Sequence, residues 1–171
     1  MGWIYALAVI ILIFGFVVFR GAPYVPSHRR FVRQAFTKKL YELGKKDVLL
    51  DVGSGDGVIL RLAAERGARA IGYEINPILI AISRFLSRNQ PLVETRLSDQ
   101  WLASFPDDTT VVYAFVVSRD TLKLAKKMQQ EADRIGRPIH LITYGANITN
   151  RTPIKVLQAH TLYRFDPLQT T

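Results

Sequence analysis

The chain has 171 residues and a mass of 19.4 kDa, enough for one domain with its own hydrophobic core and a short additional segment. Hydrophobic residues make up 49% of it and charged residues 22%, which is typical of a folded domain and not of a disordered chain. The absence of cysteine excludes disulfides, thiolate nucleophiles and cysteine-ligated metal sites, and the formal net charge of +9 indicates an anionic neighbour, either nucleic acid or membrane headgroups.

The first element in chain order is an uncharged apolar segment from Trp3 to Phe19, WIYALAVIILIFGFVVF. As a helix its 17 residues are about 25 Å long, near the minimum for crossing the hydrocarbon core of a bilayer. A cleaved signal peptide is one alternative, but no basic residue precedes the run and no small-residue cleavage site follows it. A buried core helix is the other, although a terminal helix that is apolar on every side is unusual in so small a protein. Residues 1–20 are therefore predicted to form a transmembrane anchor.

Basic residues gather directly after this segment, and no charged side chain precedes it. They are Arg20, Arg29, Arg30, Arg33, Lys38 and Lys39. Positive charge is retained on the cytoplasmic side, which predicts a single-pass protein with its N-terminus outside and its main domain on the cytoplasmic face. A bacterial inner membrane is favoured over an organelle because no presequence rich in Arg and Ser precedes the anchor. Membrane lipid then accounts for much of the net charge, and no nucleic-acid partner is expected.

Residues 21–46 are predicted to connect the anchor to the main domain. Pro23 and Pro26 favour an extended exit, Ser27 is a suitable N-cap, and Gly44 is expected to end the helix that follows. The apolar residues of this helix recur at helical spacing, with basic residues on its other faces. They are Phe31, Val32, Ala35, Phe36, Leu40 and Leu43. Two compatible roles stay open: covering an edge of the domain, or lying on the membrane surface.

Residues 47–171 alternate between strand and helix patterns. Strands are expected at 48–52, 70–74, 92–97, 110–117 and 139–144, with one or two more between 154 and 165. Helices are expected after residue 58, at 78–86 and at 121–135, the last burying Leu122, Leu124, Ala125, Met128 and Ala132. This order predicts an α/β fold in which helices cover both faces of a doubly wound, mainly parallel sheet.

The sequence VLLDVGSGDG places three glycines directly after the first strand, at residues 53, 55 and 57. In such sheets the ligand lies beyond the carboxyl ends of the strands. A dinucleotide-binding loop requires glycine or alanine at position 58, which is valine, and the Gly-Lys-Ser or Gly-Lys-Thr of a phosphate-binding loop does not occur. The remaining pattern, D-x-G-x-G-x-G, resembles the first motif of the class I S-adenosylmethionine-dependent methyltransferases.

The resemblance implies S-adenosylmethionine as the cofactor and a Rossmann-like methyltransferase sheet. That ligand carries no phosphate but has a sulfonium, an amino group and a ribose diol, for which carboxylates are good partners. Asp51 is then expected at the amino-acid end, Glu74 at the ribose hydroxyls and Asp99 near the adenine amine. The full set of expected cofactor residues is Asp51, Gly53, Ser54, Gly55, Gly57, Glu74, Asn76 and Asp99.

Three segments, PYVPSHRRFVRQAF, LLDVGSGDGVIL and GYEINP, are similar to the small membrane-anchored lysine methyltransferases related to those that act on the ATP synthase c-subunit and the adenine nucleotide translocase. This similarity implies a protein-lysine substrate in or beside a membrane. The strand at 111–115 lacks the [DN]-P-P-[YF] sequence of methyltransferases that modify base amines or glutamine amides, so no catalytic base is assigned. Tyr113, Phe115 and Tyr144 are candidates for the pocket wall, although aromatic residues at strand positions usually belong to the core.

Two further functions stay open from the sequence. The same enzyme architecture suits methylation of a lipid or small apolar metabolite, and a module that binds the cofactor without catalysis is the non-enzymatic alternative. No metal site is expected, because no metal-ligand spacing occurs.

Overall fold

The computed structural model describes residues 2–5 and 29–168, and the fold is described for these ranges. Most of the predicted transmembrane anchor and the Pro23–Ser27 exit lie outside them. Within the described ranges, the helices are all too short or too polar to span a bilayer.

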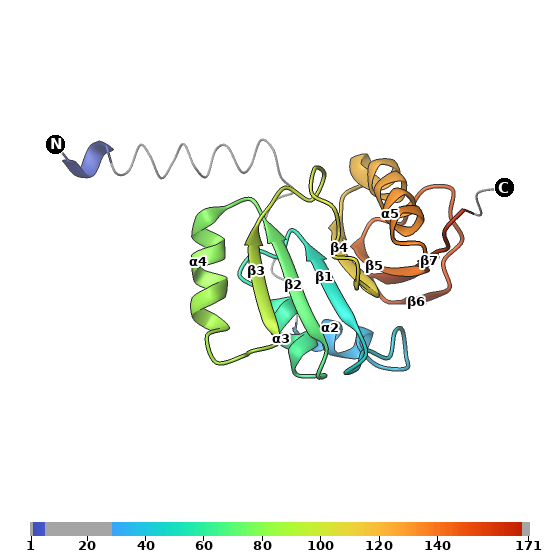
Figure 1. Cartoon of the computed structure of the whole chain (residues 1–171), viewed down its shortest axis with the longest axis horizontal. Helices are drawn as coiled ribbons and strands as arrows, with labels where there is room; N and C mark the ends of the chain where they lie inside the picture. The colour runs from blue at the N-terminus through green and yellow to red at the C-terminus, as the bar shows by residue number, and fades with distance from the viewer. Residues whose placement is uncertain (1, 6–28, 169–171) are drawn as a thin grey trace.

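Seven strands form one sheet in the order β3-β2-β1-β4-β5-β7-β6 (Figure 1). The bounds of the strands are β1 (Val48–Val52), β2 (Arg69–Glu74), β3 (Val93–Leu97), β4 (Val111–Val116), β5 (Ile139–Gly145), β6 (Lys155–Leu157) and β7 (His160–Phe165). The first five in chain order pair in parallel, whereas β7 is antiparallel to both β5 and β6. The predicted mainly parallel sheet is confirmed, and the tail supplies two strands.

Helices cover both faces of the sheet, as predicted (Figure 1). Their bounds are α2 (Arg29–Ala35), α3 (Val58–Ala64), α4 (Pro77–Leu86), the short 3₁₀ helix η1 (Ser118–Asp120) and α5 (Thr121–Ile135). On one face Phe36 and Leu60 pack with Tyr113 of β4, and on the other Met128 of α5 packs with Tyr163 of β7. Because both faces are covered, β1 is wholly apolar except for Asp51.

The helix predicted to continue to Gly44 ends instead at Ala35. Thr37 is the cause: its hydroxyl donates to the Gln34 carbonyl at 2.7 Å and its own N–H turns to the same oxygen at 3.2 Å. The chain then passes through turns, yet five of the six apolar residues expected on the buried side keep that place, and Phe31 is half-buried. Val32, Ala35, Phe36, Leu40 and Leu43 are each at most 4% exposed. This segment therefore packs on the domain, which is one of the two roles left open.

Helix α5 has the predicted bounds, but the prediction that it buries Leu122 was wrong. Leu122 is 62% exposed, whereas Leu124, Met128 and Ala132 are buried. Residues two positions apart in an α-helix point about 200° apart, so Leu122 and Leu124 are on opposite sides. Ala125 is half-buried at the boundary.

Candidate functional site

The loop after β1 adopts a backbone that favours glycine. Gly53, Gly55 and Gly57 have φ angles of +88°, +54° and +78°, in the left-handed region. A Cβ added to Gly57 would overlap the Ser83 hydroxyl of α4, so a side chain there meets both backbone strain and a collision. A Cβ at Gly53 would meet nothing within 4 Å, so this part of the loop faces open space. The bare backbone is thus available to a ligand at the carboxyl end of β1.

Asp51 is a buried carboxylate at the end of β1. It is 3% exposed, and within the described chain its Oδ2 atom has no hydrogen-bond partner. Burial raises the pKa of Asp51 well above its ordinary value, and the negative charges of Glu74 and Asp56 raise it further. A buried acid without a partner is costly unless a ligand completes it, and a cationic group is the natural complement.

Glu74, at the end of β2, ties the glycine loop to its neighbour strand. Its Oε2 accepts the Gly55 N–H at 2.8 Å, and its Oε1 accepts the N–H groups of Ile75 and Asn76 at 2.9 and 2.8 Å. The Asn76 side chain in turn caps α4, because its Oδ1 accepts the Ile78 N–H at 2.9 Å. Both predicted residues therefore shape the loop edge directly, and their contact with a cofactor stays a prediction.

Two supports of the loop were missed by the sequence analysis. Arg61 of α3 is buried beneath the loop, donates to the Asp56 carbonyl at 2.6 Å and pairs with the Asp56 carboxylate at 3.4 Å. Gly72 of β2 leaves room for Ser54, whose Oγ lies 2.5 Å from where a Cβ on Gly72 would stand. The single arginine within the apolar helix sequence VILRLAA was the available signal for the first.

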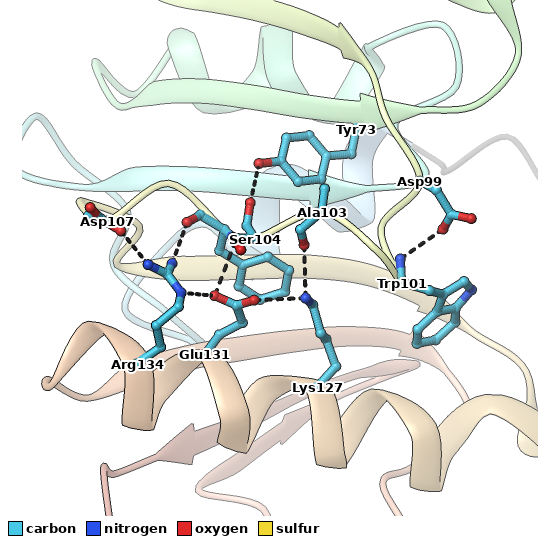
Figure 2. A network of polar contacts seen from close by, with 10 residues as sticks. Tyr73, Asp99, Trp101, Ala103, Ser104, Asp107, Lys127, Glu131 and Arg134 are labelled. Carbon is cyan, nitrogen blue, oxygen red and sulfur yellow. Dashed lines mark hydrogen bonds and ion pairs between the residues drawn. The ribbon is translucent and has the colours of Figure 1, made fainter.

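Asp99 lies in the loop between β3 and β4, two residues after the end of β3. The Ser98 N–H donates to the Glu74 carbonyl at 2.9 Å, and Asp99 Oδ1 accepts the Trp101 N–H at 2.8 Å (Figure 2). The Trp101 ring is covered by Lys123, whose Nζ lies 4.0 Å from the ring centroid. The third predicted acid is thus at the same end of the sheet as the first two.

A network on α5 holds the rest of this loop (Figure 2). Lys127 Nζ donates to the Ala103 carbonyl at 2.8 Å and pairs with Glu131 at 2.7 Å. Arg134 pairs with Glu131 at 2.8 Å and with Asp107 at 2.6 Å. Burial by itself raises the pKa of Glu131, but hydrogen bonds from Lys127 and Arg134 outweigh it and leave the pKa below its ordinary value. The loop that carries Asp99 is therefore held against α5 by hydrogen bonds and ion pairs.

The three aromatic candidates are divided by the structure. Tyr113 is 1% exposed, and its hydroxyl lies 3.0 Å from His160 Nε2, so it belongs to the core. Phe115 and Tyr144 are half-buried at the ends of β4 and β5, with ring centroids 6.0 Å apart. Burial lowers the pKa of His160 to about 4, which leaves its ring neutral at pH 7. Phe115 and Tyr144 are thus the better placed of the three to meet a substrate.

The acids and bare backbone gathered here suit a cationic nucleoside better than a metal. Among the described residues, no group of three or more His, Asp or Glu side chains is arranged to hold a metal ion. Asp51, the glycine loop, Glu74 and Asp99 are brought to one end of neighbouring strands, as the sequence predicted. The orphaned oxygen of Asp51 and the open space at Gly53 fit S-adenosylmethionine, with its cationic amino-acid end near the acid.

Comparison with known proteins agrees with this arrangement. Residues 27–141 match the family model described as a methyltransferase domain. The lysine N-methyltransferases of the ATP synthase c-subunit from Xenopus laevis and Homo sapiens are 37% and 32% identical over 120 residues, which are 68% of this chain and 51% and 50% of theirs. This chain thus spans about half the length of the curated relatives it matches.

Among solved structures, an RNA methyltransferase from Salinibacter ruber in complex with S-adenosyl-L-homocysteine is similar to this chain over most of both proteins. It is 27% identical, with a TM-score of 0.72, and the match covers 86% of this chain and 97% of that one.

Proposed function

Because this chain belongs to the S-adenosylmethionine-dependent methyltransferase family, we propose that it methylates lysine side chains of a protein in or beside a membrane. The observation that carries the proposal is the unpartnered buried carboxylate of Asp51 beside the glycine loop. The lysine preference is supported by the names of the curated relatives, which are lysine N-methyltransferases of the ATP synthase c-subunit.

The residues of the site divide the work of holding the cofactor. Asp51 is expected at its amino group, the Gly53 backbone along its amino-acid portion, Glu74 at the ribose hydroxyls and Asp99 near the adenine. When bound, S-adenosylmethionine supplies a methyl group already activated by a sulfonium.

Phe115 and Tyr144 are proposed to border the entrance for the target amine. A lysine must lose its proton before it can attack, and an apolar environment lowers the pKa of an amine. The two half-buried rings supply such an environment at the ends of β4 and β5. Alignment of the amine with the methyl group then supplies most of the rate, and no residue is assigned as a base.

The membrane location rests on the sequence. Residues 1–20 are proposed to span the bilayer, with residues 21–46 joining them to the domain and its basic residues near anionic lipid. The domain is then on the cytoplasmic side, where it can reach a lysine that a membrane protein exposes at the cytoplasmic surface of the bilayer.

The proposal is tested by incubating the full chain with host membranes and radiolabelled S-adenosylmethionine, followed by electrophoresis and amino-acid analysis of the labelled band. Label recovered as methyl-lysine in a protein supports it, provided that Asp51→Asn loses the signal and the exposed control Glu42→Gln keeps it. Label confined to the organic extract would establish instead a lipid or small apolar substrate. Cofactor binding without any transfer would point to the non-enzymatic module.

RNA methylation is a second candidate, favoured by the name of the Salinibacter ruber protein and by the net charge of +9. Adding total RNA to the same reaction separates the two. Label that is lost on ribonuclease treatment would assign the activity to RNA and reject the lysine proposal.

A further inference from the structure

Helix α4 turns its apolar side toward solvent. The residues that it buries most completely are Ile80 and Ser83, and the Ser83 hydroxyl lies 2.9 Å from the Thr95 hydroxyl of β3. A helix that covers a sheet ordinarily places its apolar stripe inward and its polar residues outward. In α4 this arrangement is largely reversed, so the contact with the sheet does not explain the apolar residues of the helix.

The outward side carries four large apolar residues at helical spacing, which together are named the α4 outer face. They are Ile78, Ile82, Phe85 and Leu86, and their exposed fractions are 36%, 41%, 64% and 45%. Residues three or four positions apart share one side of a helix, so these side chains form one patch. Contiguous exposed apolar patches of this kind mark interaction sites.

One edge of the α4 outer face is positively charged. Arg84 is not part of that edge, because it lies two positions from Ile82 and Leu86 and donates to the Thr95 carbonyl of β3 at 2.9 Å. The Arg88 guanidinium lies 4.6 Å from the centroid of the Phe85 ring and donates to the Phe85 carbonyl at 2.9 Å. The helix sequence PILIAISRFL contains no acidic residue. An apolar side bordered by a basic residue is typical of helices that lie in the headgroup region of anionic membranes.

We propose that the α4 outer face lies against the anionic leaflet of a bilayer. Lipid is favoured over a protein partner because charge complementarity requires an anionic surface, and the chain as a whole carries a net charge of +9. The contact rests on the proposed membrane location of the enzyme and adds a second attachment to it. Because α4 begins directly after Glu74 and Asn76, the attachment fixes the height and orientation of the site above the leaflet.

The test uses the full chain in vesicles of phosphatidylcholine and phosphatidylglycerol. The chain contains no cysteine, so a cysteine introduced at one position carries the only fluorescent label. Ile82→Cys places the label on the α4 outer face, and Leu122→Cys is the matched control, because Leu122 is an exposed leucine on the helix that covers the opposite face of the sheet. Each label is exposed to a nitroxide lipid quencher just below the headgroups and, separately, to aqueous iodide.

The expected result is that the lipid quencher reduces emission from the Ile82→Cys label by about twofold or more relative to the Leu122→Cys label, and that iodide acts in the reverse order. Iodide quenching of both labels alike would overturn the proposal, since the face would then be in water. Protection of the Ile82→Cys label from both quenchers would also overturn it, because protein would then cover the face, either residues 6–28 or a second copy of the chain.

A charge variant tests the role of Arg88. Arg88→Glu should weaken the lipid quenching of the Ile82→Cys label. Lys126→Glu changes the net charge equally at an exposed position and should keep the quenching. Equal effects of the two variants would reject a specific contact.

Flotation of the unlabelled chain with the vesicles separates this inference from the proposed function. A chain that does not float contradicts the membrane location and the contact together. A chain that floats and methylates lysine, but whose label stays in water, contradicts the α4 contact alone.

Discussion

Asp51→Asn should stabilise the ligand-free protein while weakening its binding of S-adenosylmethionine. Asparagine keeps the shape of the side chain and removes the ionisable group. The wild-type carboxylate is buried, its Oδ2 has no partner among the described residues, and its pKa is raised first by burial and then by Glu74 and Asp56. The same residue is therefore expected to oppose folding and to favour the ligand.

The sign of the stability change follows from the pKa of Asp51 in the folded and unfolded states. A carboxyl whose folded pKa is raised contributes its full stability below the unfolded pKa of about 4 and loses it as the pH rises toward the folded value. Each tenfold change in proton affinity is worth about 1.4 kcal/mol, and each kcal/mol moves Tm by about 2–4 °C in a domain of this size. At pH 8 the Tm of Asp51→Asn should exceed that of the wild type, and the difference should disappear near pH 4.

The effect on binding has the opposite sign. Loss of a charge-assisted hydrogen bond costs about 1.5–3 kcal/mol, so the Kd for S-adenosylmethionine should rise roughly 10- to 150-fold. Calorimetric titration and thermal unfolding measure the two effects on the same samples. Thr109→Val is the matched control, because Thr109 Oγ1 is also buried without a partner among the described residues but precedes β4, at the opposite end of the strands. A destabilised Asp51→Asn with unchanged Kd would refute the reasoning.

Three other changes test the supports of the site. Gly57→Ala should lower the unfolding free energy, measured in urea, by about 1–2 kcal/mol from backbone strain alone. The collision with the Ser83 hydroxyl should lower it further, and adding Ser83→Ala should restore this second part. Glu131→Gln should cost about 1–3 kcal/mol at pH 7, and the cost should vanish as the pH falls through the lowered pKa of Glu131. Between about pH 6.5 and 4 the His160 ring is neutral in the folded protein and charged in the unfolded chain, so the wild type loses stability as the pH falls through this range. His160→Phe should remove this loss. Acid unfolding profiles of variant and wild type that superimpose would contradict the prediction.

The sheet was predictable because its strands are buried on both faces and are separated by helical patterns. The apolar run at 48–52 and the helix at 121–135 have the predicted bounds. The early end of α2 was not predictable from spacing, since Phe36 and Leu40 continue the helical period while packing from turns. Periodicity reports which residues are buried, and a local bond such as that of Thr37 decides whether the backbone stays helical.

The acids of the site were predictable because each follows a strand, and parallel strands end at one edge. What holds them in place depends on contacts between distant residues, which no spacing reveals. Arg61 of α3 is buried beneath the loop, and Glu131 contacts a loop that precedes it by more than twenty residues. The outward apolar side of α4 was not predictable either, because the helix buries Ser83 against the sheet where an apolar residue is expected.

The packing of α2 has a mechanical consequence. Val32 and Phe36 are anchored in the same core layer as Leu60 of α3, and Arg33 pairs with Glu65 just beyond that helix at 3.0 Å. A force applied to the chain at Arg29 is therefore transmitted through α2 to α3, the helix that follows the glycine loop. A force on the segment proposed to span a bilayer would therefore reach the methyl-donor site through α3, and truncation past Arg29 would remove part of the core layer that supports this site.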